Sequence, residues 1–161
     1  MSENRQNAEG KPRYSWIDFV VLGLLFIGGA GSIAGAIAIY TEQTQFAGAS
    51  LWPLPGMVLL LWAALGIFGF VAGLFTVQQV SIHWLQALIF ITGMFIPLVI
   101  LGAFSIGTLV LIAFLFFLVS TVIMALRMKA KFLKSFGLLM LGAILHLGLL
   151  YAVITLGNSN Y

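Results

Sequence analysis

Histidine is the residue type in this sequence best suited to binding chemistry, and the chain has two, His83 and His146. His146 lies twelve residues after Lys134, which in a helix is about 18 Å of rise and places the imidazole near the middle of a bilayer. An imidazole at that depth is suited to axial ligation of haem or a chlorophyll-type pigment, or to a response to protons. The alternative is a neutral side chain that forms a hydrogen bond with a neighbouring helix.

A polar helical face is predicted around His83. Gln79, His83 and Gln86 recur at spacings of four and three, and Pro97 continues the same face. Because Pro97 lacks an N–H group, it predicts a kink and leaves the carbonyl group of Gly93 without its usual donor. One hypothesis is that this face lines a small polar pocket open to the cytoplasm. The alternative is hydrogen bonding to an adjacent helix.

Several residue types that enzymes use are scarce. The chain has no cysteine, and Asp18 is its single aspartate. It has no Ser-His-Asp arrangement, no paired intramembrane carboxylates, no P-loop and no zinc-protease motif. Because the two histidines lie at different depths, neither a haem held by both nor a protein metal site is expected. We therefore expect a non-enzymatic protein with no cofactor beyond the haem or pigment that His146 could hold.

The overall composition predicts a membrane protein. Hydrophobic residues make up 62% of the 161 residues and charged residues 7%, and the mean hydropathy is +1.16. A soluble domain is about 45–50% apolar and about 25% charged, so this chain has too little polar surface to cover itself in water. We expect an integral membrane protein that contacts the lipid bilayer. Because the basic residues are few, no nucleic-acid partner is expected.

Long apolar segments predict the elements that position the histidines. The run from 82 to 126 is about twice as long as one crossing needs, so a turn is expected at 102–108, where two glycines interrupt it. The predicted fold class is all-α, a polytopic bundle forming one transmembrane unit over 16–157, with a mobile tail at 1–15 and a short outer tail at 158–161. Its five spans are predicted at about 16–40, 56–77, 82–102, 108–126 and 136–156.

Charge placement predicts the topology. With five spans, two blocks of basic residues face the same side, and by the positive-inside rule that side is the cytoplasm. We expect the N-in, C-out orientation in the plasma membrane, with the 127–134 loop cytoplasmic. In one alternative the first span is a cleaved signal peptide, with Ala36-Ile37-Ala38 at the cleavage site. The two blocks are Arg5, Lys11 and Arg13, and Arg127, Lys129, Lys131 and Lys134.

Small residues predict the faces through which the helices pack, because helices in lipid associate by close approach of their backbones. These faces serve contacts within the bundle in one interpretation and the seam of a homo-oligomer in the other. The fourth span has no glycine and is expected to face lipid or a partner. The predicted packing residues are Gly28, Gly31, Ser32 and Gly35 in the first span and Gly66, Gly69 and Gly73 in the second.

Three functions are compatible with these features. The first is a small non-enzymatic accessory or structural subunit that packs within a membrane complex or with copies of itself. The second is a channel or permease component for a neutral solute, which would use the polar face of the third span. The third is a haem- or pigment-binding membrane subunit that uses His146.

Overall fold

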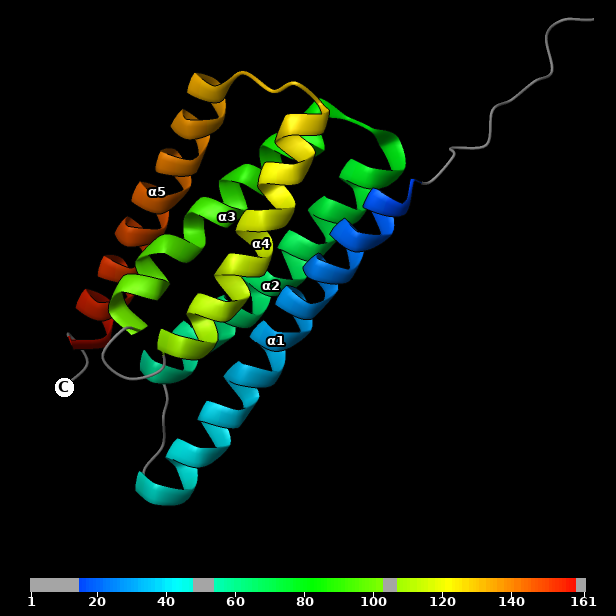
Figure 1. The fold of residues 1–161 in the computed structure, drawn as a ribbon. Helices are drawn as coiled ribbons and strands as arrows, with labels where there is room; N and C mark the ends of the chain where they lie inside the picture. The colour runs from blue at the N-terminus through cyan, green and yellow to red at the C-terminus, as the bar shows by residue number, and fades with distance from the viewer. Residues whose placement is uncertain (1–14, 48–53, 103–106, 159–161) are drawn as a thin grey trace, which may run out of the picture.

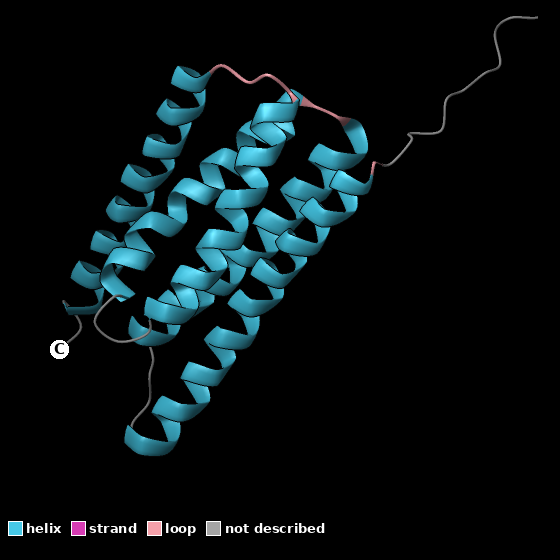
Figure 2. Ribbon diagram, in the orientation of Figure 1, coloured by secondary structure: helices cyan, strands magenta, loops and turns pink. Residues whose placement is uncertain are grey.

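The computed structural model describes residues 15–47, 54–102 and 107–158, and these residues form five helices with no strand among them. Residues 1–14 of the predicted tail at 1–15 and residues 103–106 of the predicted turn at 102–108 lie outside the described residues. All five helices are long and apolar enough to cross a membrane, which confirms the predicted all-α bundle of five spans. The chain is a multi-pass membrane protein. The helices are α1 (Trp16–Ala47), α2 (Leu54–Gln79), α3 (Ile82–Gly102), α4 (Gly107–Arg127) and α5 (Phe132–Asn158) (Figures 1 and 2).

Two helices are longer than their apolar segments predict. Helix α1 continues past residue 40 to Ala47, and Figure 1 shows its last turns projecting beyond the other helices. Thr41 and Thr44 accompany this extension by donating hydrogen bonds to carbonyl groups one turn back. Helix α5 begins at Phe132 rather than 136. Polar and basic side chains are compatible with helical backbone, so a loss of hydropathy does not mark the end of a helix.

Helix α3 occupies the centre of the bundle. It packs against α2, α4 and α5, whereas α1 packs against α2 and α4 on the other side. Helix α5 lies at the edge, where it contacts chiefly α3 (Figure 1). Any group that α5 presents to the interior therefore faces α3 first.

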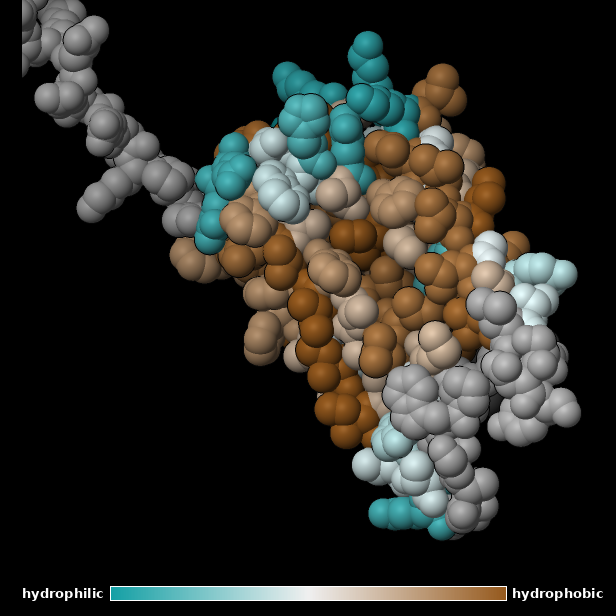
Figure 3. All heavy atoms as spheres, turned by 180° about the vertical axis from the view of Figure 1, so that it is seen from behind, coloured by the Kyte–Doolittle hydropathy of each residue, from teal (hydrophilic) through white to brown (hydrophobic). Residues whose placement is uncertain are grey.

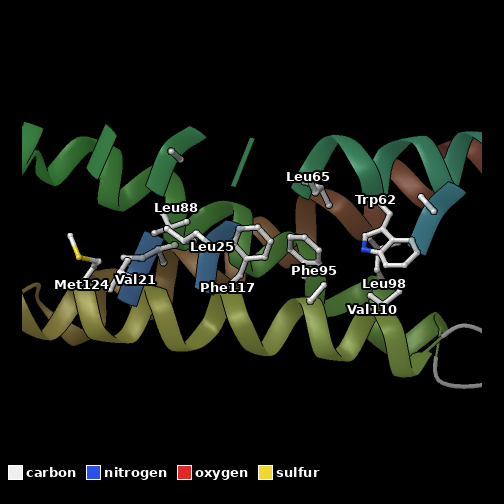
Figure 4. Close-up of a cluster of buried hydrophobic side chains, with 14 of the residues drawn as sticks. Val21, Leu25, Trp62, Leu65, Leu88, Phe95, Leu98, Val110, Phe117 and Met124 are labelled. Carbon is white, nitrogen blue, oxygen red and sulfur yellow. The ribbon is translucent and has the colours of Figure 1, made fainter. Parts of the chain in front are cut away.

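The core is built from large apolar side chains on all five helices, with Leu150 from α5. Phe95 of α3 and Phe117 of α4 stack with their ring centroids 5.1 Å apart, and Leu25 of α1 lies beside Phe117 (Figure 4). One polar contact crosses the same region, where the hydroxyl groups of Thr92 and Thr121 lie 2.9 Å apart. In a bilayer such interdigitation and buried hydrogen bonds hold helices together, because lipid tails are as apolar as the side chains.

The small residues of α1 and α2 mostly face the inside of this core. A Cβ atom on Gly35 would lie 2.5 Å from the Trp62 ring, and one on Gly66 would lie 2.6 Å from Cβ of Ser32. The other predicted packing glycines that lie in this core are close to larger side chains: Gly28 and Gly69 to Phe117, and Gly73 to Leu25. These glycines therefore serve packing within the chain.

Gly31 does not belong to this packing face. It is exposed, and a Cβ atom placed on it would have no neighbour within 4 Å. The cause is its position around the helix: at 3.6 residues per turn, Gly31 lies roughly 100° from the direction in which the buried side chains of α1 point. Of these two predicted packing residues, Gly35 thus lies inside the bundle and Gly31 lies on its outer surface.

On the face that Figure 3 shows, polar residues gather at the two ends of the molecule, with an apolar surface between them. At one end lie the start of α1, the α2–α3 turn and the α4–α5 turn (Figure 1). We call this the basic end, because the basic residues within the described ranges lie there. They are Arg127, Lys129, Lys131 and Lys134.

An ion pair joins α1 to α4 at the basic end. Asp18 is buried and pairs with Arg127, whose side chain is 37% exposed. The Asp18 carboxylate also accepts a hydrogen bond from the backbone N–H of Ser15 at 2.7 Å. This reciprocal cap fixes the start of α1, so one carboxylate both begins the first helix and connects it to the fourth.

Candidate functional site

His146 is completely buried on α5 and forms a hydrogen bond with α3. Its Nδ1 lies 2.5 Å from the carbonyl oxygen of Met94. Because a carbonyl oxygen can only accept, Nδ1 carries the hydrogen and donates it. Nε2 is then the nitrogen with the free lone pair, and it is buried without a hydrogen-bond partner among the described residues. The imidazole is therefore held in one tautomer, and its second nitrogen is unpaired among the described residues.

Two glycines allow α5 to come this close to α3. A Cβ atom on Gly93 would collide with the carbonyl oxygen of Leu139, and one on Gly142 would collide with the carbonyl oxygen of Phe90. Gly142 lies one turn before His146 and therefore shares its face of α5. The imidazole reaches the α3 backbone because both helices carry glycine at this crossing.

Pro97 lies one turn beyond Gly93, inside α3. Helix α3 continues through it to Gly102, and Pro97 is buried. Since Pro97 has no N–H group, the Gly93 carbonyl group lacks its usual intrahelical donor. The carbonyl group that His146 contacts belongs to Met94, the next residue. The structure thus brings His146 to the turn of α3 in which Pro97 removes a backbone hydrogen bond.

An apolar cavity of about 490 Å³ lies beside the imidazole, between α2, α3 and α5. His146 is the titratable residue of its lining. Its aromatic walls are Phe68 and Trp84, and the Trp84 indole N–H is already engaged, because it donates to Oε1 of Gln79 at 3.1 Å. The remaining side chains around it are aliphatic or thioether, among them Leu61, Leu65, Ile91, Met94 and Leu149.

A second buried nitrogen without a partner, Nε1 of Trp62, differs from Nε2 of His146 in two respects. Indole nitrogen is a donor with no lone pair available for a metal. Trp62 also does not line the 490 Å³ cavity. No group of three or more His, Asp or Glu side chains that could hold a metal ion occurs within 15–47, 54–102 and 107–158. Of these two nitrogens, Nε2 of His146 is therefore the one that carries a free lone pair.

The predicted polar face of Gln79, His83 and Gln86 does not form. Gln79 is the last residue of α2, and the backbone turns at Val80 with φ at 47° before α3 begins. His83 is exposed at the start of α3, and Gln86 lines a different, smaller cavity. A spacing of four and three describes one face only within a continuous helix, and the turn at Val80 breaks that continuity.

Comparison with protein-family models, with curated proteins and with solved structures gives no match for this chain. What the arrangement around His146 can do therefore follows from the chemistry of its own residues. It offers a fixed imidazole, one free nitrogen lone pair and an apolar cavity at the level of the membrane-spanning helices.

Proposed function

We propose that this chain is a non-enzymatic membrane protein that holds a flat, metal-centred cofactor of the haem or chlorophyll class through Nε2 of His146. One observation carries the proposal: Nε2 is buried without a partner among the described residues, while Nδ1 is fixed by the carbonyl group of Met94 and His146 lines an apolar cavity. Metal-binding histidines typically donate their other ring N–H in this way, which orients the imidazole and makes it a better ligand.

Energetics support a ligand at this nitrogen. A buried acceptor without a partner costs about 1–3 kcal/mol, and most buried polar atoms in proteins have partners. A metal ion bound at Nε2 of His146 would remove this cost. The aromatic side chains of Phe68 and Trp84 and the aliphatic walls suit a flat apolar ring.

The volume of the cavity and the number of imidazoles beside it limit which cofactors could bind. Its volume of about 490 Å³ falls within the roughly 300–1,000 Å³ typical of cofactor sites. Since His83 is exposed at the basic end, His146 alone supplies an imidazole here, so we propose a metal that would be held by this one nitrogen of the chain. When bound, such a group would supply light absorption or electron transfer, and the protein would orient it and exclude water.

Titration with ferric haem and with chlorophyll tests this proposal in purified detergent-solubilised protein. We expect one of the two to bind with one molecule per chain and a shifted visible band. His146→Gln, whose amide can still donate to Met94, is expected to weaken binding by roughly 100-fold, because even the loss of an orienting partner alone costs 10–100-fold. His83→Gln is the matched control and should bind as the parent protein does. Equal binding by both variants, or no binding of either probe to the parent protein, would contradict the proposal.

A second candidate function, the accessory subunit, is supported by the outer surface of α1. Small exposed residues follow one another there, and neither Gly23 nor Gly31 has a neighbour near its Cβ position. Such faces let a second transmembrane helix approach closely, so self-association or packing in a larger complex would use this face. A partner helix on this face would displace no contact within the bundle. The face consists of Gly23, Ala30, Gly31, Ala34 and Ala38.

Cross-linking tests this second role directly, because the chain has no native cysteine. We expect Ala34→Cys to form a disulfide-linked dimer, or an adduct with a partner subunit, when membranes are oxidised. Val122→Cys, exposed on α4, is the matched control and should stay monomeric. Equal cross-linking of the two variants would show random collision instead of a packing face.

The permease hypothesis has less support, because the linings of the 490 Å³ and 290 Å³ cavities include Gln86 but neither Gln79 nor His83. The plasma-membrane location and the N-in orientation stay part of the proposal. The orientation rests on the positive-inside rule applied to the basic end.

A further inference from the structure

Two cavities of different character adjoin each other at the basic end. The first, of about 290 Å³, is the more polar of the two and lies beside Gln86, Lys129, Lys131 and Lys134. The second, of about 410 Å³, is mainly apolar and lies along α4 and the start of α5. Their linings share Ile89, Lys129, Ala130 and Ser135. Together they form one amphipathic site, with its polar part nearer the end of the bundle.

The path of the chain explains this site. Helix α4 ends in a tight turn, with the Ala130 N–H bonded to the Ala125 carbonyl group and Lys129 at a φ of 50°. Helix α5 then packs on α3 and has little contact with α4, although the two are consecutive. A groove is left between α4 and α5, lined by Val122, Phe136 and other apolar side chains.

The polar part of the site is strongly positive. No ion-pair partner occurs within the described ranges for Lys129, Lys131 or Lys134, and no acidic residue lines the cavity. Helix α5 begins beside it, so unpaired backbone N–H groups of its first turn add positive potential. Gln86 and Ser135 add neutral hydrogen-bonding groups. This combination of cations and donors is complementary to a phosphate group.

We propose that this site binds one anionic phospholipid, with its phosphate among Lys129, Lys131 and Lys134 and one acyl chain in the groove between α4 and α5. The site lies at the end of the spanning helices, the level at which headgroups meet water. General attraction to an anionic surface contributes about 1 kcal/mol for each basic residue. It does not explain why the basic cavity continues into an apolar groove of acyl-chain character.

Native mass spectrometry of the purified full chain tests the proposal, with phosphatidylglycerol and phosphatidylcholine of equal chain length as probes. We expect one phosphatidylglycerol to remain bound, at least tenfold more tightly than phosphatidylcholine. Lys129→Gln, Lys131→Gln and Lys134→Gln combined should abolish this preference. The matched control removes the same charge from the other basic block, with Arg5→Gln, Lys11→Gln and Arg13→Gln, and should leave the preference unchanged.

Two further arms separate a lipid from a free phosphate and from general charge attraction. Inorganic phosphate in millimolar excess should not displace the lipid, because it cannot fill the groove. Ala125→Trp, which fills the groove without changing any charge, should weaken binding at least tenfold while the helical circular dichroism stays unchanged. Equal retention of the two lipids, displacement by phosphate, or equal loss in the two triple variants would overturn the proposal.

Discussion

Gly93→Ala is expected to lower the stability of the detergent-solubilised protein by about 3 kcal/mol, the upper end of what overpacking costs. The added methyl group would meet the carbonyl oxygen of Leu139, which is backbone and cannot rotate away as a side chain can. Gly142→Ala should have a similar effect, because it meets the carbonyl oxygen of Phe90. Either change pushes α5 from α3 and lengthens the contact between His146 and Met94.

Thermal unfolding followed by circular dichroism measures this effect, with a decrease of roughly 10 °C expected for each variant. Gly137→Ala and Gly148→Ala are matched controls on α5, the helix of Gly142, since a Cβ atom at either position meets nothing within 4 Å. Because alanine favours the helix over glycine by about 0.5–1 kcal/mol, the controls should melt at the same temperature as the parent or slightly above it. If all four variants shift alike, the close crossing of α3 and α5 is wrong.

Arg127→Met is expected to destabilise the protein by about 2 kcal/mol. It leaves the buried carboxylate of Asp18 without its cation. Breaking a fully buried pair costs about 3–5 kcal/mol, and the effect is smaller here because the Arg127 side chain is 37% exposed. The loss should appear as weaker attachment of α1 to α4 at the basic end.

A double variant separates the ion pair from a general loss of charge. Asp18→Asn combined with Arg127→Met should recover most of the stability, because the amide oxygen can still accept from the Ser15 N–H while no charge stays buried. Lys131→Met, which removes an exposed cation nearby, should change the melting temperature little. Additive losses in the double variant would mean that Asp18 and Arg127 are not coupled.

The five helices could be predicted from the sequence because hydropathy is a local property of each segment. The ends of α1 and α5 could not, since Thr41 and Lys134 lower the hydropathy without interrupting the helix. The pairing of Asp18 with Arg127 could not be predicted from the sequence either. These residues are 109 positions apart along the chain, and no local pattern connects them.

One residue of the candidate site, His146, could be predicted from the sequence, but the groups around it could not. Counting residues from Lys134 indicated the depth of His146, but the Met94 carbonyl group and the glycine crossing depend on how α5 docks on α3. Glycine one turn before Pro97 and one turn before His146 was the available signal. The polar face with Gln79 failed for a related reason, because the turn at Val80 restarts the helical register.

The most direct measurement of the central claim is the visible absorption spectrum of the protein purified in mild detergent from its native membrane. The proposed role of His146 predicts a tetrapyrrole band that co-purifies with the chain, persists in His83→Gln and is absent from His146→Gln. A colourless parent protein, or a band that His146→Gln retains at full strength, would contradict it.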